Sequence, residues 1–326
     1  MNTFIFNGQQ KPYGNVNDNI SSFFRTGTTF NNSVSVTSAS DKASIRAAIS
    51  DMRKNNIVPE SNMNRNSFMI KADANITSKF RIESRVNYIT ERVKNRPALS
   101  DSPNNVGLAL IGLAPNLDQK WLSEGYKNEY GSYVDWNGGN IYRINPYWSL
   151  NEMFNRSTKN RIMGYMQASY EFIPGLALQV RGGTDTYKFR ITEFQAISTP
   201  TARQGAMAEN SIDVSETNAE AILRYSKKIN KDFDLSAFVG GNMMFYKQEM
   251  FYNAGENQVI PDMYSITNYS ETTINYYKPR KRINSLYGAV NLGYKGFLYL
   301  DATLRNDWTS TLAKGNNSYM YPSVSG

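Results

Sequence analysis

The sequence predicts an all-β chain: an antiparallel transmembrane β-barrel, here a partial barrel of about ten strands with short periplasmic turns and long extracellular loops. Three observations lead to this prediction. Apolar and polar residues alternate with a period of two in segment after segment, which is typical of strands with one oily and one wet face. Every second connection between these segments is short. Aromatic residues make up 13% of the chain, and both strands and membrane interfaces favour them.

The composition indicates a folded protein without a membrane-spanning helix. The chain has 326 residues and is 40% hydrophobic, which suits one large or two ordinary domains. Its mean hydropathy is −0.54. The longest apolar run, Val106 to Ala114, has nine residues, about half of what a transmembrane helix needs. A β-barrel remains possible, because its alternating strands average to a polar hydropathy.

The chain contains no cysteine and no histidine. Disulfides, thiolate metal sites, a cysteine nucleophile, the Ser-His-Asp triad and nearly every zinc site are therefore excluded. We expect no catalytic residue, no metal and no cofactor. The net charge is +8, but it is scattered. The one dense basic run, Lys278 to Arg282, is predicted to be a solvated loop end, and we expect no nucleic-acid partner.

The first elements are weakly marked. Residues 1–28 are rich in Asn, Asp and Gly and are predicted to form a connector that enters the barrel, with a helical turn between Asn19 and Thr26. From residue 29 the alternation begins, weakly over Phe30 to Val36 and clearly over residues 43–49. Residues 29–326 are therefore expected to form the barrel section.

The clearest hairpin lies between Asn64 and Arg92. Phe68 and Ile70 begin an apolar set on even positions, with charged residues between them, and the same pattern resumes at Phe80 after a short turn. Each strand thus separates an apolar surface from a charged one.

A long irregular region, about residues 97–157, follows this hairpin and is expected to be an extracellular loop with a short helix over residues 105–114. Three further hairpins turn at residues 173–175, 230–232 and 294–296. Between them, residues 193–216 and 252–280 are polar and are predicted to be long loops. The order is strand, tight turn, strand, long loop, and outer-membrane barrels share this asymmetry.

Aromatic residues gather next to the tight turns. They would form one girdle at a membrane interface; the alternative is that they pack across the core of a soluble protein. The residues concerned are Phe80, Tyr170, Phe172, Phe233, Tyr294 and Phe297.

The polar positions of the strands supply the candidate site. They would line the lumen of a barrel or contact a plug, with plain solvation of a polar interior as the alternative. A carboxylate pair such as Asp73 with Glu83 could in principle serve glycoside hydrolysis, but carboxylates interleaved with arginine are more often ion-paired. The candidate lumen-facing residues are Lys71, Asp73, Arg81, Glu83, Arg85, Asn87, Gln179, Arg181, Asp301 and Arg305.

Aromatic residues in the long loop are a second candidate site. Their faces suit stacking on sugar rings or anchoring a partner, although fastening the loop to the barrel wall would use the same residues. The candidates for ligand or partner contact are Trp121, Tyr133, Trp136, Tyr147 and Trp148.

Three stretches of the sequence resemble the SusC/RagA family of TonB-dependent outer-membrane transporters. They are the turn Tyr170 to Leu176, the Asn-Pro-Tyr-Trp motif at residues 145–148, and the closing run Leu304 to Leu312 followed by residues 317–325. The resemblance covers the chain from about Ile20 onward. It implies a 22-stranded barrel with an amino-terminal plug, of which this sequence would be an internal section lacking the plug and the final strands.

The resemblance also implies a function and partners. It implies active uptake of oligosaccharides or peptides across the outer membrane of a Gram-negative bacterium, without covalent chemistry. The implied partners are a SusD-like surface lipoprotein, outer-membrane lipid, and TonB, which would act through the absent amino-terminal region. The alternative is a soluble surface adhesin or carbohydrate-binding β-sandwich, which would bury Phe68, Ile70, Val86 and Leu300 in one core.

Overall fold

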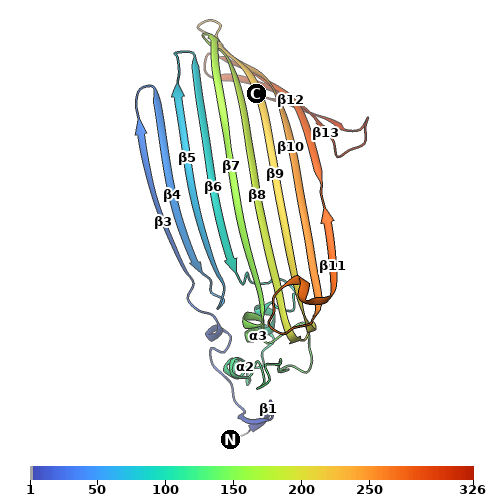
Figure 1. The fold of residues 1–326 in the computed structure, drawn as a ribbon. Helices are drawn as coiled ribbons and strands as arrows, with labels where there is room; N and C mark the ends of the chain where they lie inside the picture. Colours follow the sequence, from blue (N-terminus) through green and yellow to red (C-terminus); the bar gives the residue numbers. More distant parts are fainter. Residues whose placement is uncertain (1–2) are drawn as a thin grey trace.

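The computed structural model describes residues 3–326, so the first two positions of the predicted connector lie outside it. The chain forms one large antiparallel sheet of twelve strands in the order β14-β13-β12-β10-β9-β8-β7-β6-β5-β4-β3, with β11 also paired to β10, and a separate two-stranded sheet β1-β2. Figure 1 shows the strands side by side in one curved sheet, with the helices and β1 gathered at one end.

The elements have the following bounds. The strands are β1 Thr3–Phe6, β2 Gln9–Pro12, β3 Thr28–Ala39, β4 Ala43–Asn55, β5 Asn62–Asn75, β6 Phe80–Lys94, β7 Met153–Ile173, β8 Leu176–Thr199, β9 Ala202–Lys228, β10 Phe233–Gln258, β11 Tyr269–Tyr277, β12 Arg280–Tyr294, β13 Leu298–Thr309 and β14 Ser318–Ser325; the helices are η1 Ser21–Phe23, α1 Val106–Ile111, α2 Gln119–Glu124, α3 Pro146–Asn151 and η2 Ile266–Asn268.

The two ends of the sheet differ as the sequence predicts for the loop at about residues 97–157, but not for the loop predicted at residues 193–216, where the connection is residues 200–201. At one end, the turn end, the five connections 40–42, 76–79, 174–175, 229–232 and 295–297 have two to four residues each. At the other, the loop end, residues 95–152 form one connection that holds α1, α2 and α3. The helix expected over residues 105–114 is α1. No helix within residues 3–326 is long and apolar enough to span a membrane.

Two predicted loops are wrong. Residues 193–216 are the end of β8 and the start of β9, which pair up to Thr199 and Ala202. Residues 252–280 contain the end of β10 and all of β11. Backbone pairing continues here although the apolar alternation stops, because a strand needs an apolar face only where that face meets a core or lipid.

One face of the sheet is apolar and open. Phe68, Ile70, Val86 and Leu300 share this face, and they are 40%, 37%, 47% and 51% exposed. No second sheet covers them within the described part of the chain. This finding contradicts the soluble β-sandwich alternative, which required these four side chains to be buried in one core.

The buried core lies at the loop end instead. Phe23 of η1 packs with Val58, Val106, Leu110 and Leu150. The amino-terminal segment is thereby fastened to the long connection, and a backbone bond of 2.9 Å from the Val16 N–H to the Pro115 carbonyl adds to this. We call residues 3–27 together with residues 95–152 the loop cap.

Candidate functional site

The polar face of the sheet collects all ten candidate lumen-facing residues. The registers show this. Lys71 lies opposite Arg85 and Asp73 opposite Glu83, while Arg181 pairs with the Gln167 position on β7. Directly paired residues point to the same side of a sheet. The full set, in strand order, is Lys71 and Asp73 on β5, Arg81, Glu83, Arg85 and Asn87 on β6, Gln179 and Arg181 on β8, and Asp301 and Arg305 on β13.

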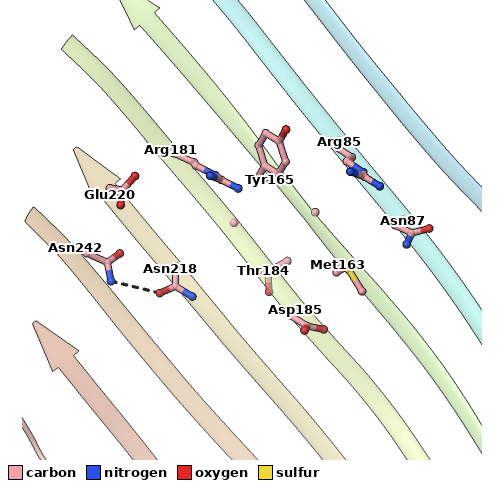
Figure 2. Close-up of a pocket in the computed structure, with 12 residues that line it drawn as sticks. Arg85, Asn87, Met163, Tyr165, Arg181, Thr184, Asp185, Asn218, Glu220 and Asn242 are labelled. Carbon is pink, nitrogen blue, oxygen red and sulfur yellow. Dashed lines mark hydrogen bonds between the residues drawn. The ribbon is translucent and has the colours of Figure 1, made fainter. Parts of the chain in front are cut away.

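This face contains a hollow of about 550 Å³ between β6 and β10. Arg85, Asn87 and Arg181 of the predicted set line it. Figure 2 shows them with the neighbouring side chains and marks the bond of 3.4 Å from the Asn242 amide to the Asn218 amide oxygen. The hollow also exposes residues that the sequence prediction did not single out: Met163, Tyr165, Thr184, Asp185, Asn218, Glu220 and Asn242.

The carboxylates beside the hollow are paired. Arg81 reaches Asp73 at 3.1 Å and Glu83 at 3.9 Å, and Lys71 lies 3.8 Å from Glu83. Asp73 and Glu83, the pair considered for acid–base catalysis, are therefore ion-paired, which was the favoured reading of the sequence. Tyr165 also donates its hydroxyl proton to Glu83. Through these contacts, both carboxylates already accept hydrogen bonds or ion pairs from side chains of this chain.

Two arginines at the hollow stand apart from this network. Within residues 3–326, no carboxylate lies within 4.0 Å of Arg85 or Arg181. The Arg181 guanidinium instead lies over the ring of Tyr165, 4.1 Å from its centroid. Asp185 is already bound to Arg161, whose Nε donates at 2.7 Å. The hollow thus offers two guanidinium groups, which suit a carboxylate or another anion. It also holds the Glu220 carboxylate, which lies directly opposite Arg181 in register and accepts from the Tyr287 hydroxyl.

The candidates on β13 are held locally and lie away from the hollow. Asp301 accepts from the Asn291 amide at 2.6 Å. Arg305 donates to Ser285 at 2.9 Å and to Asp307 at 2.8 Å, and it covers the ring of Tyr287 at 5.3 Å. The structure therefore does not bring Asp301 and Arg305 together with Arg85 and Arg181.

Among the loop aromatics, Trp148 is part of a core. It is 0% exposed, its indole N–H donates to Thr199 Oγ1 at 2.9 Å, and the rings of Tyr126 and Tyr133 pack against it. The expectation that Trp148 contacts a ligand is wrong, because burial leaves it no free face. It fastens the loop cap to the end of β8, which was the alternative interpretation.

Tyr133 and Tyr147 are also engaged within the loop cap. The Tyr133 hydroxyl accepts from the Asn145 N–H at 3.2 Å, and burial raises the pKa of Tyr133 to about 12. Tyr147 donates to the Gln119 side chain and packs edge-on against Phe23. Burial likewise raises the pKa of Tyr147. Both residues stabilise the cap.

Trp121 and Trp136 keep part of their surface free. Trp121 packs against Phe4 and Phe6 of the β1-β2 hairpin, with Lys11 over its ring at 5.4 Å. Trp136 donates its indole N–H to the Arg143 carbonyl at 2.9 Å. Like Tyr133 and Tyr147, these two tryptophans are half-buried.

The missed residues of the hollow lie where glycines interrupt the alternation. A Cβ on Gly164 would lie 2.5 Å from the Arg85 carbonyl oxygen, so this position requires glycine. A Cβ on Gly183 would lie 3.2 Å from the Gly164 carbonyl oxygen and 3.3 Å from the Tyr165 Cβ, which is a tight contact. The sequence could have identified Tyr165 and Asp185. Their odd position numbers alternate with the even, apolar positions of β7 and β8 if the count is continued across the glycines.

Comparisons with known proteins agree with this geometry. No protein-family model matches the sequence, and no curated protein sequence matches it. Solved structures do match. The RagAB peptide transporter superposes with a TM-score of 0.77 at 16% identity, covering 94% of this chain and 35% of the other.

Two further barrels match over similar lengths. The ferric citrate transporter FecA matches with a TM-score of 0.58 at 8% identity, covering 91% of this chain and 36% of the other. BauA, the ferric preacinetobactin receptor from Acinetobacter baumannii, matches with a TM-score of 0.56 at 11% identity, covering 91% of this chain and 43% of the other. The chain spans about a third of the length of the RagAB chain. It has the fold of part of a TonB-dependent transporter barrel of the RagA kind.

Proposed function

We propose that this chain is a section of the wall of an outer-membrane nutrient importer of the SusC/RagA kind, in a Gram-negative bacterium. One observation carries the proposal: a single sheet has a continuous, open apolar face on one side and a hollowed, charged face on the other. Lipid would cover the apolar face, and the polar face would line the lumen. Residues 1–28 would lead into the wall formed by residues 29–326.

The height of the apolar face supports this proposal. On β10 the outward positions are apolar from Leu235 to Phe245, and Lys247 follows. Ten steps of about 3.3 Å give roughly 33 Å along the strand. At a tilt of about 45° this is about 23 Å across the membrane, close to the apolar band of about 25 Å that outer-membrane barrels present.

The length of the central strands supports it as well. β8, β9 and β10 have 24, 27 and 26 residues, whereas about 9 to 11 residues cross a bilayer. The surplus lies at the loop end, where it carries the loop cap beyond the lipid. Large barrels that hold a plug in the lumen have the width that such a wall section needs.

The substrate and partners follow from the same site. Arg85 and Arg181 would bind an anionic group, and the carboxylate of a peptide is one such group; RagAB is a peptide transporter. Oligosaccharides are the alternative cargo, for which Trp136 and Trp121 offer aromatic faces. A SusD-like lipoprotein would sit over the loop end, and TonB would supply the energy for transport.

The experiment is uptake by cells that produce the complete transporter. We expect the double change Arg85→Gln and Arg181→Gln to reduce peptide uptake while the protein still reaches the outer-membrane fraction. Arg46 and Arg65 lie on the same face, outside the hollow. Their double change to Gln removes the same charge and is the matched control. Unchanged uptake in the first variant would show that the hollow does not bind the peptide during transport. Recovery of the protein in the soluble fraction would contradict the proposal as a whole.

A further inference from the structure

The apolar face is bordered at the loop end by aromatic residues. Tyr88 on β6, Phe245 on β10 and Trp308 on β13 mark this border, and they are 41%, 45% and 39% exposed; Phe251 lies at an outward position further along β10. All three point to the apolar side, because each continues the parity of that face. Aromatic side chains with one apolar and one wet end collect where hydrocarbon meets headgroups.

Toward the loop end, outward positions on β4, β6, β10 and β12 carry cations. On β4, β5 and β6, Arg53, Asn64 and Arg92 lie directly opposite one another in register. They line a hollow of about 460 Å³ together with Asp51, Asn66 and Thr90. We call this group of six the Arg53–Arg92 site.

The Arg53–Arg92 site keeps positive charge available. Asp51 accepts from Arg53 Nε at 3.0 Å, and the Arg53 side chain is 74% exposed. Within residues 3–326, no carboxylate lies within 4.0 Å of Arg92. Adjacent strands are about 4.8 Å apart, so the two arginines stand about 10 Å apart and can approach one anion from both sides. An amide and a hydroxyl beside them add hydrogen-bond donors.

A second cationic group lies on the same face, on β10 and β12. Lys247 is opposite Arg280, and Phe245 is opposite Arg282. The Arg282 guanidinium lies 4.9 Å from the centroid of the Phe245 ring. Glu249 is bound by Lys247 and by Lys278, each at 2.8 Å, which leaves Arg280 and Arg282 without a carboxylate partner in the described chain. The basic run Lys278 to Arg282 is therefore not only a loop end, because Arg280 and Arg282 lie at outward positions of β12.

We propose that these two groups bind the phosphates of a glycolipid of the lipid A class in the outer leaflet; this rests on the proposed function, which places the apolar face in the bilayer. Their position selects this ligand. The cations lie on the apolar side of the sheet, next to aromatic side chains of that face, where headgroup phosphates of a neighbouring lipid would stand. Paired guanidinium groups match phosphate oxygens in geometry and charge.

The test is lipid binding by the complete barrel purified in detergent. The probes are bisphosphorylated lipid A, the same lipid without its phosphates, and phosphatidylglycerol. The retained lipid is measured by native mass spectrometry. We expect lipid A to bind preferentially and the change Arg53→Gln with Arg92→Gln, or Arg280→Gln with Arg282→Gln, to weaken binding about tenfold. The pair Arg46→Gln with Arg65→Gln, of equal charge change on the opposite face, should bind like the parent.

Each other outcome overturns the assignment. Equal binding of dephosphorylated lipid A would show that phosphate is not recognised, and equal binding of phosphatidylglycerol would assign the cations to anionic phospholipid in general. An equal loss of lipid A binding in the opposite-face control would show that net charge, and not the position of the arginines, determines binding. Folding of every variant is checked by its heat-dependent migration in gels. If the barrel inserts into bilayers but does not bind lipid A, only this inference is contradicted. If the barrel does not insert, the proposed function is contradicted.

Discussion

Placing a charge in the middle of the apolar face should be far more costly than placing it one residue further along the same strand. Met166 lies midway between Tyr170 and Ile162 on the apolar face of β7 and is 62% exposed. If lipid is its solvent, Met166→Arg puts a guanidinium at the bilayer midplane, which costs about 2 to 4 kcal/mol in outer-membrane barrels. This corresponds to a 30- to 1000-fold shift in the unfolding equilibrium.

The adjacent change Gln167→Arg is the matched control. Gln167 points to the polar face, opposite Glu83 and Arg181, so its replacement should change stability by less than about 0.5 kcal/mol. The assay is guanidinium unfolding of the complete barrel in phospholipid vesicles, followed by tryptophan fluorescence. Equal effects of the two changes, or a cost below about 1 kcal/mol for Met166→Arg, would refute the assignment of that face to lipid.

Three further outcomes follow from the turns and the loop cap. Trp148→Ala should cost the cap about 3 to 5 kcal/mol, seen as hydrogen exchange in residues 119–152 at least a hundredfold faster while the strands stay protected. Gly175→Ala should lower barrel stability more than Gly296→Ala, because both have a positive φ but only at Gly175 would the new Cβ meet a backbone carbonyl, that of Ser226; equal effects would contradict this. The pKa of Tyr133 is about 12 in the folded cap and about 10 when unfolded, so cap stability should be intact below pH 10 and fall as the pH rises to 12. Near-ultraviolet circular dichroism measures this loss, which Tyr133→Phe should reduce but not abolish, because the pKa of Tyr147 in the same cap is also raised.

The sequence predicted the membrane-height part of the sheet well. There, lipid or core on one side and water on the other impose the alternation that begins at Phe68 and resumes at Phe80. The hairpin turns at 173–175 and 294–296 are observed, and the aromatic residues beside the turns touch in pairs such as Phe80 with Tyr170 and Phe233 with Tyr294. These features depend on local pattern alone.

The parts predicted wrongly lie at the loop end, where the apolar residues follow no regular period. Residues 193–216 pair within β8 and β9, and Phe194 and Met207 are buried there although most residues of this stretch are polar. The burial of Trp148 in the loop cap could not be predicted from the local sequence either. Its indole is buried by Thr199, Tyr126 and Tyr133, and only the tertiary arrangement brings β8 to that ring.

The most direct measurement uses the absence of cysteine from this chain. Single cysteines placed along β6 from Ile82 to Tyr88 would each carry a spin label in the complete barrel, reconstituted in bilayers. The account predicts that collision with oxygen, which concentrates in lipid, is high at the even positions, while collision with a water-soluble nickel chelate is high at Glu83, Arg85 and Asn87. Equal access of the nickel chelate at even and odd positions would contradict it.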